Sequence, residues 1–201
     1  MFQWPSMRYE GDPGVQWMLA YQAGDEAAFD RLVEGYSGQL YALLTRFLGP
    51  VSEREDLLQE VFLRVIRARE RYQPTARFST WLYRITFNIA VNRTQRNPGT
   101  VSLEAPNDLG ELGPLGRQAA PGDEPDRELE RNDVIAAVRR AIDSLPASQR
   151  MALVLAKYEE LPYAEIAMVM GSSEKAIKSM IHRARENMRA RLAPYLQEEA
   201  T

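Results

Sequence analysis

The sequence predicts an all-α protein of two small helical domains joined by a flexible acidic linker. Three observations support this fold class. Apolar residues recur at intervals of three and four from residue 15 to residue 96 and again from 126 to 192, which is the spacing of amphipathic helices. No segment shows the strict alternation that is typical of a strand. Residues 98–125 are rich in Gly, Pro and acids and poor in large apolar side chains, so we expect a flexible linker there.

The first domain is predicted over residues 15–97. Residues 1–14 should form a flexible tail, because glycine and proline interrupt any periodicity. A short helix follows over 15–23, and Asp25 is placed to cap a longer helix that ends before Pro50. Glycines inside that longer helix predict a bend. Its core stripe comprises Phe29, Leu32, Val33, Tyr36, Leu40, Leu43, Leu44 and Phe47.

The next helix carries two contrasting faces. A capping box should open it, with Ser52 accepting from a free amide and Glu55 reaching back. Its core face comprises Leu57, Leu58, Val61, Phe62, Val65 and Ile66. Its outer face comprises Asp56, Gln59, Glu60, Leu63 and Arg67. An exposed leucine among acids and amides indicates a docking surface for a partner, and a merely solvated face is the alternative.

A loop containing Pro74 leads into the last helix of this domain, because proline lacks an N–H donor and ends the preceding helix. Ser79 or Thr80 is expected to cap the new helix. One stripe should be core, and it comprises Phe78, Trp81, Leu82, Ile85 and Ile89. A second stripe comprises Tyr83, Phe87 and Val91.

The same helix favours nucleic-acid binding. From Arg77 to Arg96 the chain has four arginines and no acid. Aromatic side chains interleaved with arginines suit a single nucleic-acid strand, since bases stack on rings and phosphates pair with guanidinium groups. A purely buried aromatic cluster is the alternative.

The second domain is predicted over residues 126–195. Its first helix, closed by Pro146, has an apolar stripe that comprises Leu129, Val134, Val138, Ile142 and Leu145. Its second helix has Met151, Val154, Leu155 and Tyr158. A third helix, a tight turn at Gly171 and a long helix capped by Ser172 or Ser173 give a helix-turn-helix layout. Ile177, Ile181, Ala184, Met188 and Leu192 form the buried stripe of that last helix.

The opposite face of the last helix is basic and can enter a major groove, where Arg, Lys and Ser contact phosphates or base edges. Its candidate contacts are Ser173, Lys175, Lys178, Ser179, His182, Arg183 and Arg185. His182 is the only histidine, so it has no partner His or Cys for a metal site, and DNA contact or plain exposure is expected of it.

Charge and composition narrow the function further. The net charge is −3, but residues 104–133 hold nine acids against three arginines, whereas residues 175–191 hold six basic side chains against one acid. The absence of cysteine excludes disulfides and thiolate metal sites and suits the cytoplasm. We find no apolar run of membrane-spanning length, no nucleophile–base pair and no metal-ligand spacing. We therefore expect no cofactor, no metal, no membrane insertion and no enzymatic activity.

Two runs carry a family resemblance. The run D-x-x-Q-E-V-F-L from Asp56, followed by F-S-T-W-L-Y-R-I from Phe78, resembles region 2 of the extracytoplasmic-function (ECF) sigma factors of bacterial RNA polymerase. The run Ile177-Lys-Ser-Met-Ile-His-Arg-Ala-Arg185, with Leu161, Tyr163 and Glu165 before it, resembles region 4 of that family.

The resemblance implies partners for each surface. Core RNA polymerase would bind through its β′ clamp helices and β flap, with the Asp56 face docking on the clamp helices. Residues implied to contact the promoter −10 element are Tyr72, Arg77, Phe78, Ser79, Thr80, Trp81, Arg84, Asn88, Asn92 and Arg93. The basic face from Ser173 to Arg185 would contact the −35 element. An anti-sigma factor is a further possible partner. The alternative function is an ordinary helix-turn-helix regulator with an N-terminal sensing domain.

Overall fold

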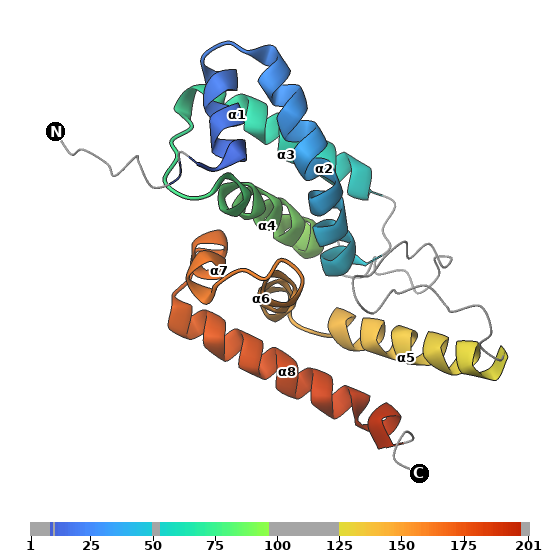
Figure 1. Ribbon diagram of the computed structural model, residues 1–201. Coiled ribbons are helices and arrows are strands. Elements are labelled where there is room, and N and C mark those ends of the chain that lie inside the picture. Colours follow the sequence, from blue (N-terminus) through green and yellow to red (C-terminus); the bar gives the residue numbers. More distant parts are fainter. Residues whose placement is uncertain (1–8, 10, 50–52, 97–124, 198–201) are drawn as a thin grey trace.

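The structure, a computed structural model, describes residue 9 and residues 11–49, 53–96 and 125–197, and these fold into α-helices with one short 3₁₀ helix (Figure 1). The N-terminal domain contains α1 (Pro13–Gln22), α2 (Glu26–Leu48), α3 (Arg54–Ala68), η2 (Arg69–Arg71) and α4 (Phe78–Arg96). The C-terminal domain contains α5 (Pro125–Asp143), α6 (Ala147–Lys157), α7 (Tyr163–Met170) and α8 (Glu174–Gln197). The described residues contain no strand, which confirms the all-α prediction. The predicted linker, residues 98–125, lies outside the described residues except for Pro125.

Helix α1 begins at Pro13, two residues before the predicted start. The Asp12 carboxylate accepts a hydrogen bond of 3.0 Å from the Val15 amide, and proline suits the first helical position because its φ is already helical. Gly14, expected in the tail, is buried in the helix. A Cβ at Gly14 would lie 2.8 Å from Phe78, so only glycine lets α1 approach α4 this closely.

Helix α2 runs without interruption from Glu26 to Leu48. A Cβ at Gly35 would lie 3.0 Å from the Trp17 ring, so this glycine makes room for α1. Asp25 occupies the N-cap position, but its carboxylate pairs with Arg31 at 2.7 Å instead of capping the helix.

The predicted cap of α4 is wrong, and the predicted cap residue of α3 lies outside the described residues. Helix α3 has Glu53 at its N-cap, without a side-chain cap, and Ser52 lies outside the described residues. Helix α4 begins at Phe78, so Ser79 and Thr80 lie inside its first turn. The Trp81 amide donates to the Arg77 carbonyl in the first bond of the helix, so Arg77 and not Ser79 or Thr80 stands at the N-cap position. The loop after Pro74 turns into the helix earlier than the sequence indicated.

The core stripes are largely as predicted. Leu57, Val61, Phe62 and Val65 of α3 are buried. Ile66 is an exception, because its side chain is 41% exposed. Among the α5 side chains that the structure describes, Ala137 and Ala141 are buried and Val134 is 42% exposed, so this part of the helix is rotated from the predicted orientation.

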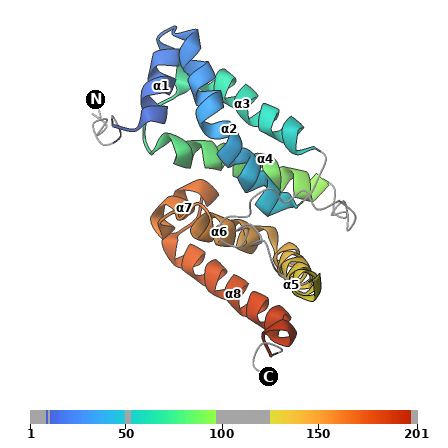
Figure 2. The same ribbon diagram turned by 45° about the vertical axis from the view of Figure 1, so that its right-hand side comes forward.

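The two domains pack against each other. Helix α4 lies between the rest of the N-terminal domain and the pair α6–α7, while α8 lies on the far side of that pair (Figures 1 and 2). Helix α2 also contacts α6, so the buried residues of both domains form one continuous apolar cluster. No helix in the described part of the chain is long and apolar enough to cross a membrane.

Candidate nucleic-acid interface

The helix-turn-helix is formed as predicted. Gly171 ends α7 with a left-handed φ of 60°, a conformation that glycine adopts without strain. The Ser173 hydroxyl then accepts the Ala176 amide at 3.2 Å, which caps α8. Ile177 and Ile181 are buried against the domain core, so the opposite side of α8 faces outwards.

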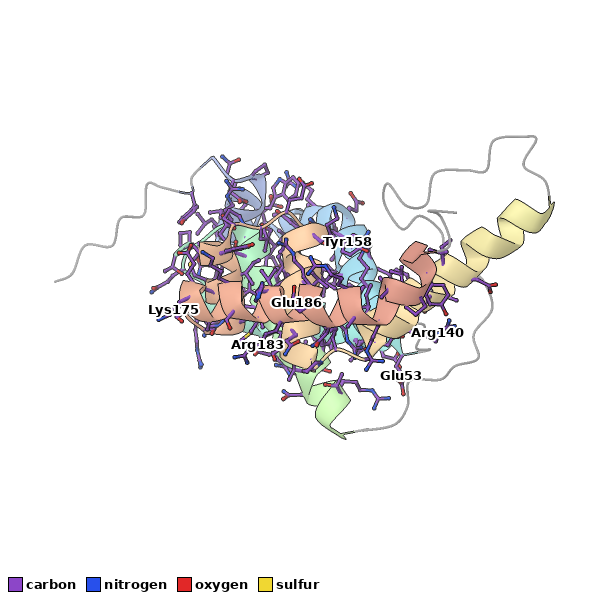
Figure 3. All side chains as sticks on the ribbon, turned by 90° about the horizontal axis from the view of Figure 1, so that it is seen from below. Glu53, Arg140, Tyr158, Lys175, Arg183 and Glu186 are labelled. Carbon is purple, nitrogen blue, oxygen red and sulfur yellow. The ribbon has the colours of Figure 1, made fainter. Side chains whose placement is uncertain are left out.

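All seven residues predicted on the outer face of α8 are exposed. Figure 3 views this face directly, and Lys175 and Arg183 project from the helix. The exposed set is Ser173, Lys175, Lys178, Ser179, His182, Arg183 and Arg185. We name these residues the α8 basic face. Because a helix with donors along one side fits a major groove, this face can contact duplex phosphates and base edges.

The outer face of α3 is also exposed. Asp56, Gln59, Glu60, Leu63 and Arg67 all lie in contact with solvent, and the Leu63 side chain is 48% exposed. The neighbouring Ile66 enlarges the apolar area of this surface, which we name the α3 docking face. Such a face offers acceptors around an apolar centre, as protein interfaces commonly do.

Seven of the ten residues predicted to contact the −10 element fall into two groups. Arg77, Arg84, Asn88 and Asn92 are exposed on α4 or its preceding loop. Ser79, Trp81 and Arg93 are partly buried. Arg93 pairs with Glu53 at the start of α3, and this hydrogen bond lowers the pKa of the Glu53 carboxyl. These two groups are therefore accessible or partly accessible from outside.

Tyr72 and Phe78 do not face outwards, and the prediction that they contact DNA is not supported by their positions. Both rings are buried, with Phe78 fully covered. They form one aromatic cluster with Trp81, whose ring centroid lies 5.0 Å from that of Tyr72 and 5.5 Å from that of Phe78. Burial raises the pKa of the Tyr72 phenol far above its ordinary value, and that of Tyr36 beside Phe78 to about 12. The buried Tyr72 and Phe78 rings therefore pack against the Trp81 ring from the interior of the domain.

Thr80 is also buried, because the C-terminal domain covers it. Its hydroxyl donates a hydrogen bond of 2.7 Å to Glu165 of α7. Tyr83, from the second stripe of α4, is buried as well and donates a hydrogen bond of 2.5 Å to Glu159. The second stripe therefore packs against protein here, where the sequence suggested stacked bases.

Sequence reasoning did not identify Glu159 and Glu165 as functional candidates. Glu159 precedes the helix-turn-helix, and Glu165 lies in its first helix, α7. Nothing in the local spacing of either residue indicates which distant side chains it contacts. In the residues that the structure describes, no group of three His, Cys, Asp or Glu side chains is placed to hold a metal ion.

Comparison with known proteins matches both halves of the chain. The family model described as Sigma-70 region 2 matches residues 32–97, and the model Sigma-70, region 4 matches residues 135–188. The RNA polymerase sigma-H factor of Pseudomonas aeruginosa is 36% identical over 182 residues, which is 88% of this chain and 92% of that protein. The ECF RNA polymerase sigma factor SigE of Mycolicibacterium smegmatis is 36% identical over 88% of this chain and 67% of its own. The ECF RNA polymerase sigma-E factor of Escherichia coli is 32% identical over 88% of this chain and 92% of its own.

Solved structures share the fold. CnrH, solved in complex with the cytosolic domain of CnrY, aligns with a TM-score of 0.64 at 23% identity over 91% of this chain and 99% of its own. The sigma factor RpoE of Bartonella quintana, solved in complex with the anti-sigma factor NepR, aligns with a TM-score of 0.58 at 20% identity over 82% of this chain and 96% of its own.

Proposed function

The chain belongs to the sigma-70 family, as a sigma factor of the extracytoplasmic-function type, and from this premise we propose which of its surfaces bind RNA polymerase and which bind the promoter. A sigma factor of this type directs core RNA polymerase to promoters and starts transcription there. The alternative, an ordinary helix-turn-helix regulator, is not favoured, because the N-terminal half matches sigma-70 region 2.

The α3 docking face binds core polymerase in this proposal. Its support is the exposure of Leu63 and Ile66 among acids and amides on the helix that matches region 2. The clamp helices of the polymerase β′ subunit are the expected partner, and the C-terminal domain is expected to meet the β flap. The solved relative from Bartonella quintana is in complex with an anti-sigma factor, and in this proposal such a factor would compete with polymerase for these surfaces.

The DNA contacts are divided between the domains. The α8 basic face enters the major groove of the −35 element. On α4, Trp81, Arg84 and Asn88 contact the −10 element, with Arg77, Ser79, Thr80, Asn92 and Arg93 around them. Ring and amide contacts to unstacked bases compensate for the few kcal/mol that unstacking costs. The chain itself makes and breaks no covalent bond, since the polymerase supplies that chemistry, and we place the protein with the polymerase in the cytoplasm.

The observation that carries the proposal is the presence on one chain of both an exposed α3 docking face and an exposed α8 basic face. Run-off transcription with purified core polymerase tests it. We expect initiation at defined promoter positions at which core polymerase alone produces no transcript. A chain that binds DNA but starts no transcripts would instead be a regulator.

Lys178→Ala should weaken binding of the polymerase complex to promoter duplex by about fivefold, the equivalent of ~1 kcal/mol for one basic contact. If Lys178 contacts a phosphate, the slope of log affinity against log salt should also fall by about one. Fluorescence anisotropy at several salt concentrations measures both. Arg191→Ala is the matched control, because it removes one exposed positive charge from the same helix outside the α8 basic face. Equal losses in the two variants would show a general charge effect and count against the docking face.

A further inference from the structure

The α4–α7 contact involves two residues that the proposed function assigns to DNA. The Glu165 carboxylate accepts a hydrogen bond of 2.7 Å from the Thr80 hydroxyl, and its other oxygen lies 3.9 Å from the Arg77 guanidinium. Thr80 is almost completely covered. A carboxylate and a DNA phosphate are both anions that accept hydrogen bonds through oxygen. Glu165 therefore accepts from the Thr80 hydroxyl and lies within ion-pair distance of the Arg77 guanidinium, two groups that a phosphate could also contact.

A second glutamate, Glu159, makes a more deeply buried contact between the two domains. Glu159 follows α6 in the C-terminal domain, and its side chain is only 4% exposed. The Glu159 carboxylate accepts from three side chains of the N-terminal domain: Tyr83 donates at 2.5 Å, Gln39 at 3.0 Å and Arg46 at 3.4 Å. Burial and the neighbouring Glu159 charge both raise the pKa of Tyr83, so its phenol stays protonated as a donor.

Arg46 is held at the same place by a second interaction. Its guanidinium lies over the Tyr158 ring, 4.7 Å from the ring centroid, in addition to pairing with Glu159. Both contacts cross from α2 to the C-terminal domain. A buried charge with several donors in good geometry is costly to separate, because each partner would lose a hydrogen bond that the dry interior strengthens.

The other functional surfaces remain open in this arrangement. The α3 docking face and the α8 basic face are both exposed while Thr80 is covered. Polymerase can therefore dock on α3 without any domain movement. Contact between the −10 element and Thr80, in contrast, requires α7 to leave α4.

We propose that the C-terminal domain inhibits the N-terminal domain in cis, with Glu165 standing in for a DNA phosphate against Thr80 and Arg77 and Glu159 holding the two domains closed. This inference rests on the proposed function, because it takes α4 as the −10 surface. In the closed arrangement the free chain binds single-stranded DNA weakly through α4, and separation of the domains exposes that surface after polymerase has docked.

The first test removes both carboxylate charges in Glu159→Gln/Glu165→Gln. Because the chain has no cysteine, Glu34→Cys on α2 and Ala190→Cys on α8 can carry spin labels at exposed positions that report the distance between domains. The DNA probe is a labelled 30-nucleotide pool of random single strands. We expect a longer and broader interdomain distance and DNA binding about five- to tenfold tighter. Both arms compare chains with the same α8 basic face, so the difference reports α4.

The matched control is Asp133→Asn/Glu160→Gln, which removes two negative charges at exposed positions outside the α8 basic face. It should leave the distance unchanged and DNA affinity within about twofold. Equal tightening in the control and the test variant would overturn the proposal, because net charge alone would explain it. Opening without tighter DNA binding, or tighter binding without opening, would overturn it as well.

A second test closes the domains and does not depend on how well the glutamine variant folds. Gln39→Cys and Glu160→Cys, joined by a cleavable bismaleimide, hold α2 against the segment after α6. The cross-linked chain should bind the single-stranded pool at least fivefold more weakly than the same chain after cleavage of the linker. Equal affinities before and after cleavage would refute inhibition in cis. Run-off transcription by the wild-type chain separates the two ideas, because initiation there upholds the proposed function whichever way the closure tests turn out.

Discussion

Leu63→Asp is expected to reduce transcription from a dependent promoter by about a hundredfold, through loss of binding to core polymerase. The side chain is 48% exposed beside Ile66 at the centre of the α3 docking face, so little in the free chain depends on it. In a docked complex, an aspartate there would bury an unpaired charge against an apolar partner surface. Loss of a central apolar contact together with that desolvation costs at least ~2–3 kcal/mol, which corresponds to the hundredfold effect. Titration of labelled chain with core polymerase measures the loss directly.

Stability and position are controlled separately for this prediction. The free energy of unfolding should change by no more than about 0.5 kcal/mol, since the site is on the surface. Val134→Asp is the matched control, because Val134 is a similarly exposed apolar residue on α5, in the other domain. It should leave polymerase affinity intact. Normal polymerase binding by Leu63→Asp would mean that α3 docks through other residues or does not dock at all.

Helices with one buried face were the predictable part of this molecule. Leu57, Val61 and Val65 of α3, and Ile177 and Ile181 of α8, recur at helical spacing and are buried as expected. When only one side of a helix meets a core, the apolar pattern also identifies the opposite side. The α3 docking face and the α8 basic face could therefore be identified from sequence.

Helix α4 was less predictable because it is covered on two sides. Its first stripe packs into the N-terminal domain, and its second, with Tyr83 and Thr80, meets α6 and α7 of the other domain. The Thr80–Glu165 contact joins residues 85 positions apart, and local spacing carries no signal for such a pair. A second aromatic stripe beside arginines therefore favoured stacked bases, whereas in this arrangement it lies against protein.

The prediction of the α4 cap residue was wrong for a related reason. A serine or threonine caps a helix only if the chain turns into the helix directly after it. The loop beyond Pro74 turns at Arg77, so Ser79 and Thr80 fall within α4 and the Thr80 hydroxyl becomes available to Glu165. The direction of a loop depends on packing, here on the contacts among Tyr72, Phe78 and Trp81.

Arg150 is a further residue whose role the sequence did not indicate. It lies on α6, is 8% exposed, and donates to the Phe47 carbonyl at the end of α2 at 2.9 Å. It also donates to the carbonyls of Asp143, the last residue of α5, and of Leu145. The last carbonyls of a helix lack partners within the helix, and a cation there also meets the negative end of the helix dipole. One guanidinium thus caps two helices, one from each domain.

The charge pair at this site is not the main source of stability. The Arg150 guanidinium lies 3.6 Å from the Asp143 carboxylate. Burial nevertheless raises the pKa of Asp143 and lowers that of Arg150, so for both groups the cost of desolvation outweighs the attraction between them. We therefore expect the stabilisation by Arg150 to come chiefly from its bonds to the three carbonyl groups.

Arg150→Met should accordingly lower the free energy of unfolding by about 3–5 kcal/mol, because it leaves buried carbonyls without donors and the Asp143 carboxylate without its cation. Urea denaturation measures the loss, and Arg140→Met, at an exposed position on α5, should cost no more than about 0.5 kcal/mol. Adding Asp143→Asn to Arg150→Met should recover about 1–2 kcal/mol, since it removes only the stranded charge. Complete recovery in the double variant would contradict the capping argument, because it would place the whole effect in the ion pair and none in the carbonyl groups.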